Sequence, residues 1–327
     1  KIESIAQGST GAKTLYAQWT LITYTITYEG LNGVENPNTA TSYTVETETI
    51  TLQDFSHDDY TFEGWFDAET GGNKVTSIPK GSTGNKTLYA HCTWKWIGTK
   101  NPITAKAVGD IVFSDGSATP YSTNLTLSDA QKKAAVAVIF YAGSASDTLG
   151  AKTLGVGLKN TNTLQWARYT SSDDKAEGYS TNITAIQCTP SESGSGKAAT
   201  ATFTGDFDGS DNWKTLCDAV SDEETSGKYP AWEWVNAYAT ENSLEGSYAN
   251  GWYLPTLAEL SMLYRVKDTV DSALEKADGT KIADMTYWSS SQNASYGYIA
   301  WNVSFYDGYL DDNPKTDFYA VCTVRAF

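Results

Sequence analysis

The stretch Tyr298–Gly308, YIAWNVSFYDG, decides how the C-terminal part of the chain folds. Its apolar side chains recur at every second position: Ile299, Trp301, Val303 and Phe305. A period of two predicts a β-strand, because successive side chains of a strand point to opposite faces of the sheet. The alternate positions would lie on the second face: Tyr298, Ala300, Asn302 and Ser304. We therefore expect one face in the core and the other available, with a hairpin turn at Asp307-Gly308.

A particular mixture of polar and aromatic residues surrounds this strand. It consists of Ser295, Tyr296, Tyr306, Tyr309, Asp311, Asp312, Asn313, Thr316 and Asp317. Antibody paratopes use similar mixtures, because Tyr offers rigid amphipathic contact area and small polar residues adapt their hydrogen bonds. The composition is therefore that of a recognition surface. It is equally compatible with half-buried strand aromatics beside ordinary polar loops.

Helices are predicted upstream of this stretch. The clearest follows Thr256, which forms a capping box with Glu259. Pro230 suits the first turn of a second helix, because its missing N–H would have no partner there. A third helix is predicted over residues 213–220. Strands are predicted within residues 107–117, 134–143 and 153–158, so the fold class is α+β.

An internal repeat organises the N-terminal part. The segment GSTGAKTLYAQWT, Gly8–Thr20, returns as GSTGNKTLYAHCT, Gly81–Thr93. Self-similarity of this kind is typical of repeated modules. The composition changes again beyond Trp96. We therefore divide the chain into a C-terminal tail of a preceding, truncated copy, one whole repeat, and a separate domain, at residues 1–20, 21–95 and 96–327.

The charge balance excludes some classes of function. Lys plus Arg is 23 and Asp plus Glu is 39, which gives a formal net charge of −16. Nucleic-acid binding needs clustered basic residues to neutralise phosphates, and the chain has no such cluster. The longest apolar run, 134–142, is far shorter than the roughly 20 residues that a membrane-spanning helix requires. Neither nucleic acid nor a membrane interior is an expected partner.

Residues with catalytic or metal-binding chemistry are sparse. The two histidines, His57 and His91, both lie in the repeat, and the four cysteines include no CxxC pair. We predict no enzymatic activity, no cofactor and no metal centre. The loop with Asp206, Asp208 and Asp211 departs from an EF-hand, because its glycine occupies the fourth loop position instead of the sixth. A structural cation at this loop stays open.

The module at residues 21–95 resembles a known repeat. It contains YTFEGWFDAETGG at Tyr60–Gly72 and KTLYAHCTW at Lys86–Trp94. These motifs are similar to the Listeria–Bacteroides repeats, of internalin B type, of bacterial surface proteins. The resemblance implies a small β-rich, β-grasp-like spacer that connects the cell envelope to a distal domain. One departure is Cys92, which stands where Trp19 stands in the preceding tail.

Residues 96–327 contain four motifs in an order that resembles a second family. The motifs are GWYLPTLAEL at Gly251–Leu260, YWSSS at Tyr287–Ser291, AWNVSFYDG at Ala300–Gly308 and VCTVRAF at Val321–Phe327. They are similar to the variable proteins of diversity-generating retroelements, most closely those of treponemes. The resemblance implies a C-type lectin fold of the formylglycine-generating-enzyme subclass. It also implies that a reverse transcriptase scatters Asn AAC codons to NNC codons, which cannot encode Lys, Gln, Glu, Trp or Met.

The resemblance assigns roles to individual residues. The expected variable, ligand-binding positions are Ser295, Tyr296, Tyr298, Tyr306, Asp307, Tyr309, Asp311, Asp312, Thr316, Asp317 and Phe318. All of them except Ser295 and Thr316 are expected to form one contiguous exposed patch. The expected scaffold is Trp252, Trp288 and Trp301, to which the codon rule adds Gln292 and Lys315. C-type lectins commonly join their first helix to their last strand by a disulfide, which implies a Cys217–Cys322 bond. Two buried thiols are the alternative.

These implications lead to an expected function. The chain would be a surface-displayed protein that binds diverse ligands, chiefly proteins, through a hypervariable face. One alternative is a carbohydrate-binding lectin, although Trp301-Asn302 keeps only two residues of the calcium-binding WND tripeptide and the chain has no EPN or QPD. The other is a structural envelope protein that binds nothing. We expect an exported, monomeric lipoprotein of the outer membrane, attached by a segment that precedes residue 1.

Overall fold

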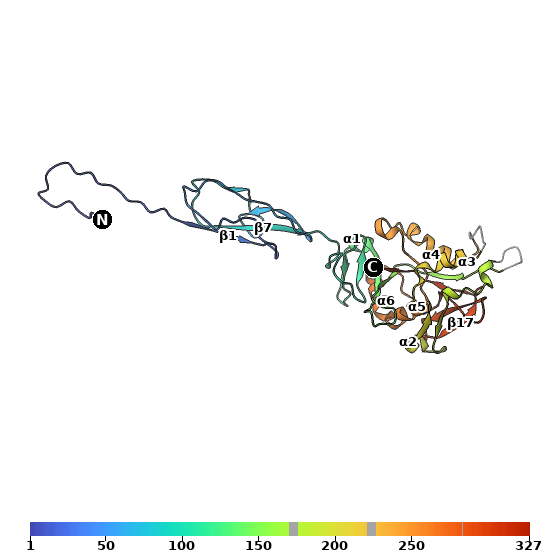
Figure 1. Ribbon diagram of the computed structural model, residues 1–327. Helices are drawn as coiled ribbons and strands as arrows, with labels where there is room; N and C mark the ends of the chain where they lie inside the picture. The colour runs from blue at the N-terminus through green and yellow to red at the C-terminus, as the bar shows by residue number, and fades with distance from the viewer. Residues whose placement is uncertain (170–175, 221–226, 283) are drawn as a thin grey trace. The chain divides into compact units, whose positions relative to one another are not determined.

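The protein consists of two compact units, Lys1–Lys95 and Trp96–Phe327. The computed structural model describes residues 1–169, 176–220, 227–282 and 284–327 (Figure 1). The boundary between the units lies where the sequence changes in composition. In the described part of the chain, no helix has the length and apolar character needed to cross a bilayer.

Unit 1 is built on a five-stranded sheet of order β2-β1-β7-β4-β5. The first and last strands, β1 and β7, lie side by side and parallel, and β4 pairs with β7 antiparallel. The strands are β1 (Tyr24–Glu29), β2 (Ser42–Tyr43), β3 (Ile50–Thr51), β4 (Tyr60–Phe66), β5 (Lys74–Val75), β6 (Ser77–Ile78) and β7 (Lys86–Trp94). Residues 1–20 contain no strand or helix. The predicted β-rich character of the module is confirmed.

Aromatic rings form the core of unit 1 around Trp65. The ring centroids of Tyr28, Phe62 and Phe55 lie 5.2, 5.7 and 6.0 Å from the Trp65 ring, and each contacts it edge-on. The Trp65 indole N–H donates to the carbonyl oxygen of Gln53 at 3.0 Å. Offset and edge-on ring pairs add to the stabilisation that burial provides. Trp65, on β4, is therefore the centre of this small hydrophobic core.

Unit 2 contains two five-stranded sheets, of order β19-β11-β10-β8-β9 and β12-β18-β15-β16-β17. In the second sheet β15 and β18 are parallel and the other pairs antiparallel. The first sheet contains β8 (Ile111–Phe113), β9 (Ala118–Thr119), β10 (Ala135–Ala142), β11 (Thr153–Gly157) and β19 (Val324–Ala326). The second contains β12 (Thr161–Gln165), β15 (Thr286–Gln292), β16 (Ile299–Ser304), β17 (Leu310–Pro314) and β18 (Phe318–Val321). A small ribbon pairs β13 (Cys188–Pro190) with β14 (Phe203–Gly205).

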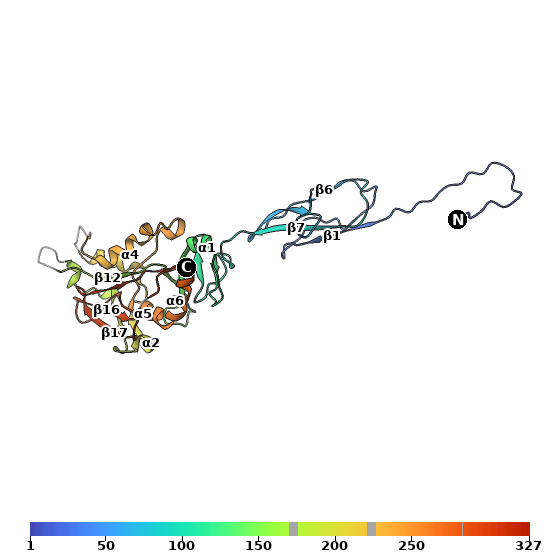
Figure 2. The same ribbon diagram turned by 180° about the vertical axis from the view of Figure 1, so that it is seen from behind.

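The helices of unit 2 pack against these sheets. They are α1 (Asp129–Ala134), α2 (Lys197–Thr200), α3 (Asn212–Ala219), α4 (Pro230–Glu241), α5 (Leu257–Arg265) and α6 (Lys267–Lys276), with 3-10 turns η1 (Glu177–Tyr179), η2 (Thr184–Ile186), η3 (Gly209–Asp211) and η4 (Gly246–Ala249). Helix α5 is buried along most of its length and contacts β10, β13, β15 and β16. In Figures 1 and 2 the C-terminus lies beside α1, and β16 and β17 lie toward the other end of unit 2. The mixed α+β class of the chain is confirmed.

The three predicted helices are present as α3, α4 and α5. The capping box at Thr256 has both of its bonds: Glu259 N donates to the Thr256 hydroxyl, and Thr256 N donates to the Glu259 carboxylate. Sequence analysis missed α1, α2 and α6. Helix α6 begins at Lys267, and its N-cap residue Val266 offers no side-chain cap, so the start of the helix carries no recognisable signal.

Strand β16 is buried on both faces, which corrects the expectation of one available face. Trp301 and Val303 pack into one hydrophobic cluster, and Ala300 packs into a second one with Trp288 and Val321. The Asn302 side chain is also almost wholly buried. Because side chains from both faces of β16 join a hydrophobic cluster, both faces are covered by neighbouring structure. Access to this sheet is therefore restricted to its loops, its edge and one hollow described below.

The expected disulfide between Cys217 and Cys322 is wrong, because both residues are free thiols. The inward-facing residues of α3 are Asn212 and Leu216, which leaves Cys217 half-exposed. Cys322 is buried in a different hydrophobic cluster from the one that Leu216 joins. Burial raises the pKa of Cys322 to about 12. The alternative of two buried thiols therefore holds for Cys322 and not for Cys217.

Candidate ligand-binding face

The turn between β16 and β17 is fixed by local hydrogen bonds. Asp307 Oδ1 accepts from the Ser304 hydroxyl at 2.7 Å and from the Tyr309 backbone N–H at 3.2 Å. Gly308 has a φ of 71°, and a Cβ at this position would lie 2.6 Å from the Tyr264 hydroxyl. Only glycine fits this conformation and this approach. The Asp-Gly turn of the sequence is confirmed, and it sets the positions of Tyr306 and Tyr309.

Five large aromatic side chains of the predicted patch are exposed, by 41 to 76%. They are Tyr296, Tyr298, Tyr306, Tyr309 and Phe318. Among the other large apolar side chains described in unit 2, only Ile103, Val108 and Tyr169 are classed as exposed. Ser295 and Asp307 are also exposed, and Asp311, Thr316 and Asp317 are half-buried. Exposed aromatic surface in unit 2 is therefore concentrated near β16, β17 and β18.

Two further tyrosines extend this surface. The Tyr296 and Tyr298 ring centroids are 5.9 Å apart, and those of Tyr298 and Tyr179 are 6.4 Å apart. Tyr179 in turn stacks on Tyr169 at 5.0 Å with nearly parallel rings. We call these four residues the tyrosine row. Sequence analysis missed Tyr169 and Tyr179, because they lie more than a hundred residues upstream and only their residue type marks them.

A hollow of about 260 Å³ lies over the face of the second sheet that carries Asn302 and Asp311. Its lining comes from β15, β16, β17, β18 and the turn: Thr286, Asn302, Ser304, Asp307, Tyr309, Asp311, Asn313 and Tyr319. Asn302 and Asp311 are direct cross-strand neighbours, so their side chains share a face. Asn302 Nδ2 donates to Asn313 Oδ1 at 2.8 Å. The alternation of β16 pointed to Asn302 and Ser304, but nothing in the sequence indicated that they line a hollow.

Asp317 connects the tyrosine row to the hollow. Burial raises the pKa of Tyr179, and the charge of Asp317 contributes to that increase. Burial also raises the pKa of Tyr319, and there the charges of Asp317 and Asp311 contribute. Since such interactions weaken with distance, Asp317 lies near both tyrosines. The row, the hollow, Tyr306 and Asp317 together are called the C-terminal face from here on, whereas Phe318 precedes Tyr319 in β18 and points to the opposite side of the sheet.

Asp312 does not join the hollow with its neighbour Asp311. Consecutive residues of a strand point to opposite faces, and Asp312 is the cross-strand neighbour of Trp301. Its carboxylate accepts a hydrogen bond from Asn293 Nδ2 at 2.6 Å. Burial, followed by the nearby charge of Asp311, raises the pKa of Asp312. The expectation that both aspartates share one surface is therefore corrected.

Buried polar residues support the face from below. Gln292 Nε2 donates to the carbonyl oxygens of Thr181 and Gly297 at 2.7 and 2.9 Å, and its Oε1 accepts from Ile183 N. Lys315 Nζ donates to the Gly178 carbonyl at 2.7 Å and lies 4.0 Å from the centroid of the Trp166 ring. Burial lowers the pKa of Lys315 well below its ordinary value. These bonds connect the loops under the tyrosine row to strands β15 and β17.

The tryptophans of the expected scaffold, Trp252, Trp288 and Trp301, are all buried. The Trp288 indole N–H donates to the Leu164 carbonyl at 2.9 Å, and that of Trp252 donates to Tyr248 O at 2.8 Å. The Trp288 ring also contacts Tyr319 edge-on, with centroids 4.7 Å apart. Trp288 therefore packs directly beneath a residue that lines the hollow.

The carboxylates of the acidic loop near Asp206 are paired with hydrogen-bond donors and a lysine of the protein itself. Asp206 accepts from Asn212 Nδ2 at 2.7 Å and from the Asp208 backbone N–H at 2.9 Å, and Asp208 pairs with Lys152 at 2.8 Å. Burial raises the pKa of the adjacent Glu259 to about 7. Within the described ranges, no group of three or more His, Cys, Asp or Glu side chains is arranged to hold a metal ion. The geometry gives no support to the cation that the sequence left open at this loop.

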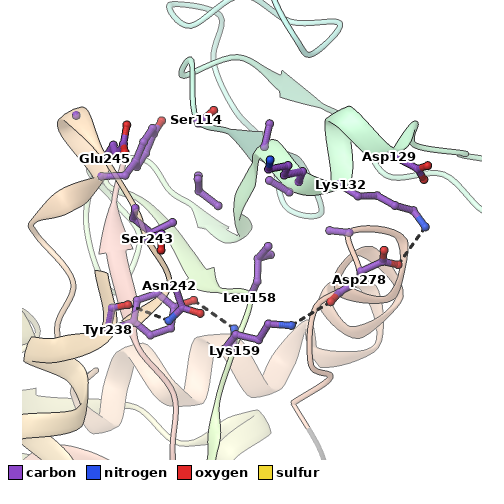
Figure 3. Close-up of a pocket in the computed structure, with 18 residues that line it drawn as sticks. Ser114, Asp129, Lys132, Leu158, Lys159, Tyr238, Asn242, Ser243, Glu245 and Asp278 are labelled. Atoms are coloured by element: carbon purple, nitrogen blue, oxygen red, sulfur yellow. Dashed lines mark hydrogen bonds and ion pairs between the residues drawn. The ribbon is translucent and has the colours of Figure 1, made fainter. Parts of the chain in front are cut away.

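A larger pocket of about 880 Å³ lies between α1, η4 and the C-terminal ends of α4 and α6 (Figure 3). Several of its polar groups are paired with one another. Lys132 Nζ and Asp278 Oδ1 are 3.1 Å apart, and Lys159 Nζ donates to the Asp278 carbonyl oxygen at 3.2 Å. None of the described residues that line it is His or Cys. The pocket thus has no nucleophile paired with a histidine base.

Comparison with known proteins identifies part of unit 1. Residues 24–91 match the family model of the Listeria-Bacteroides repeat domain. Internalin H of Listeria monocytogenes is 40% identical over 81 residues, which cover 24% of this chain and 14% of that protein. A crystal structure of a fimbrial protein from Bacteroides ovatus aligns over 93% of this chain and 69% of that one, with 15% identity and a TM-score of 0.46. The sheet of unit 1 therefore lies in the segment that is similar to Listeria–Bacteroides repeat domains.

Proposed function

We propose that this chain is a ligand-binding protein of the bacterial surface, in which unit 1 is a spacer and the C-terminal face of unit 2 binds protein ligands. The observation that carries the proposal is the exposure of Tyr296, Tyr298, Tyr306, Tyr309 and Phe318 around one sheet. Exposed aromatic groups of this density mark interaction surfaces. Aromatic residues also contribute a large share of the energy in interfaces.

The fold and the diversification mechanism belong to the same proposal. Unit 2 would be a C-type-lectin-like domain, and its C-terminal face would be diversified by a retroelement. The four family-like motifs support this, because they fall on adjacent parts of unit 2. GWYLPTLAEL leads into α5, YWSSS lies in β15, AWNVSFYDG covers most of β16 and the following turn, and VCTVRAF leads from β18 through β19. Helix α5 contacts both β15 and β16.

The difference in burial between the expected variable positions and the expected scaffold positions also favours a variable face. The side chains that NNC codons cannot encode, Gln292, Trp301 and Lys315, are buried. The large aromatic side chains that such codons can encode are exposed at the positions assigned to variation. Exposed positions generally tolerate substitution with little change in stability. A face built in this way can change its side chains and retain its backbone.

The location that accompanies the proposal is the cell surface, and more specifically a lipid-anchored position at the outer membrane. The repeat domain of unit 1 supports the first part, because the resemblance of its motifs is to repeats of bacterial surface proteins. Lipid attachment is tested by metabolic labelling of the full-length gene product with a palmitate analogue. Surface exposure is tested by protease accessibility on intact cells.

The central experiment uses two libraries of the full chain. The first places NNC codons at Tyr296, Tyr298, Tyr306, Tyr309 and Phe318. The matched control places NNC codons at five buried positions, Trp252, Trp288, Gln292, Trp301 and Lys315. Each library is displayed, sorted for folded protein, and selected against a defined test protein such as lysozyme.

We expect most members of the first library to fold and some to bind the test protein specifically. Most members of the control library should fail to fold, because they lose buried side chains and buried hydrogen bonds. Equal folding losses in the two libraries would contradict the proposal. They would favour a structural role for the aromatic residues instead.

A further inference from the structure

We propose that the hollow of the C-terminal face receives an arginine side chain of the protein ligand. This inference rests on the proposed function and specifies the chemistry of the partner. It follows from three properties of the hollow: its charge, an amide carbonyl group that is open to it, and its size.

The hollow is acidic and has no basic residue in its lining. Asp307 and Asp311 contribute carboxylates, and neither forms an ion pair with a described lysine or arginine. Among the described residues, Asp311 Oδ1 accepts a hydrogen bond only from the neighbouring Asp312 backbone N–H, at 3.0 Å. Asp317 lies nearby and adds a third negative charge to the face. The charge that complements this hollow is positive.

Asn302 supplies an independent indication of a ligand. Its side chain is 99% buried, lines the hollow, and donates through Nδ2 to Asn313. Its Oδ1 accepts no hydrogen bond from any described residue. This oxygen is not among the described buried polar atoms that lack a partner, so it is open to the hollow and free to accept a hydrogen bond from a donor outside the chain. A cation that also donates hydrogen bonds fits this acceptor.

The size and the walls of the hollow select the type of cation. Its volume of about 260 Å³ is below the roughly 300 to 1,000 Å³ of small-molecule sites, and it suits one side chain. Tyr309 and Tyr319 add aromatic rings, on which a guanidinium group stacks well. The acceptors come from several strands, and the five fixed N–H donors of arginine reach more of them than a lysine ammonium does.

The test selects peptides from a random 12-residue display library on the full chain. Binders that compete with one another are synthesised with each arginine replaced by citrulline, which keeps the shape and removes the charge. We expect enrichment of arginine, and about a tenfold or greater loss of affinity with citrulline, the size typical of a lost charge-assisted hydrogen bond.

Two protein variants locate the effect. Asp311→Asn removes a carboxylate of the hollow and should abolish the difference between the arginine and citrulline peptides. Asp317→Asn is the matched control, because it removes the same charge from the same face outside the lining. It should keep most of the discrimination. Both variants are first compared with the parent in thermal melts.

The outcomes separate this inference from the proposed function. One outcome is a set of peptides that no longer bind the Tyr296→Ser and Tyr306→Ser variants but keep their affinity when arginine is replaced by citrulline. This outcome supports the proposed function and contradicts the arginine site. Enrichment of acidic peptides, or equal discrimination by the Asp311→Asn variant, also overturns it. Failure to recover any peptide that depends on the C-terminal face contradicts both proposals.

Discussion

Unit 1 and the C-terminal face of unit 2 are both rich in aromatic residues, but they use them in opposite ways. In unit 1 Tyr28, Phe55 and Phe62 surround a buried Trp65. In the C-terminal face Tyr296 and Tyr306 expose about half or more of their surface. A small module has little interior, so its large side chains must fill the core. Unit 2 has three clusters of its own and leaves aromatic residues outside them. Aromatic content therefore indicates function only where it exceeds the needs of the core.

The largest expected effect comes from removing a buried indole from either unit. Trp65→Ala should lower the free energy of unfolding of unit 1, and Trp301→Ala that of unit 2, by about 3 to 5 kcal/mol. The physical cause is lost burial together with a residual cavity. Urea melts followed by far-UV circular dichroism measure both. A loss below about 1 kcal/mol for either variant would break the contrast, because that indole would not be part of a core.

The contrast between buried and exposed groups also applies to acids. Glu259 is fully buried, and burial raises its pKa to about 7. Between pH 4.5 and 7 the folded protein therefore holds a proton that the unfolded chain releases, so stability falls as the pH rises through this range. The shift from 4.5 to about 7 corresponds to about 3 kcal/mol.

Glu259→Gln should remove this contribution to the pH dependence and keep the capping box, because Gln also accepts the hydrogen bond from Thr256 N. Thermal melts of both proteins from pH 4.5 to 7.5 provide the measurement. Asp206 and Asp271, whose pKa values are also raised by burial, stay unchanged in the pair and cancel in the difference. Parallel pH profiles for the two proteins would show that Glu259 does not titrate in this range.

The smallest effect on stability is expected at the exposed tyrosines. Tyr306→Ser and Tyr296→Ser should each leave the free energy of unfolding within about 0.5 kcal/mol of the parent, since these rings are largely in water. The same urea melts apply. Tyrosine variants that unfold as readily as Trp301→Ala would place the tyrosines in a core, and the structural-protein alternative would then replace ligand binding.

Features with a local chemical cause were predictable from the sequence. The capping box of Thr256 and Glu259 is present, and so is the turn at Asp307-Gly308. Both depend on residues within three positions of each other, and their hydrogen bonds are determined by the local backbone. The internal repeat was equally predictable, because it requires only a comparison of the chain with itself.

Features that depend on distant contacts were not predictable. The alternation of β16 indicated one open face, but the second hydrophobic cluster covers Ala300 on the other side. Asp311 and Asp312 are adjacent residues of the same type, and yet their side chains point to opposite sides of β17. Tyr169 and Tyr179 reach the C-terminal face only through the tertiary fold. The implied disulfide was wrong because the position of a cysteine around a helix axis determines what it can reach.

The bonds of Gln292 and Lys315 have a consequence for how such a protein evolves. Each anchors backbone from below, through the carbonyl oxygens of Thr181 and Gly178, and neither depends on a side chain of the tyrosine row. The loops above them are thus held by groups that a change of exposed side chains leaves intact. Under the proposed diversification, a population of these chains would explore many surface sequences while most members remain folded, so new specificities would arise without an accompanying burden of misfolded protein.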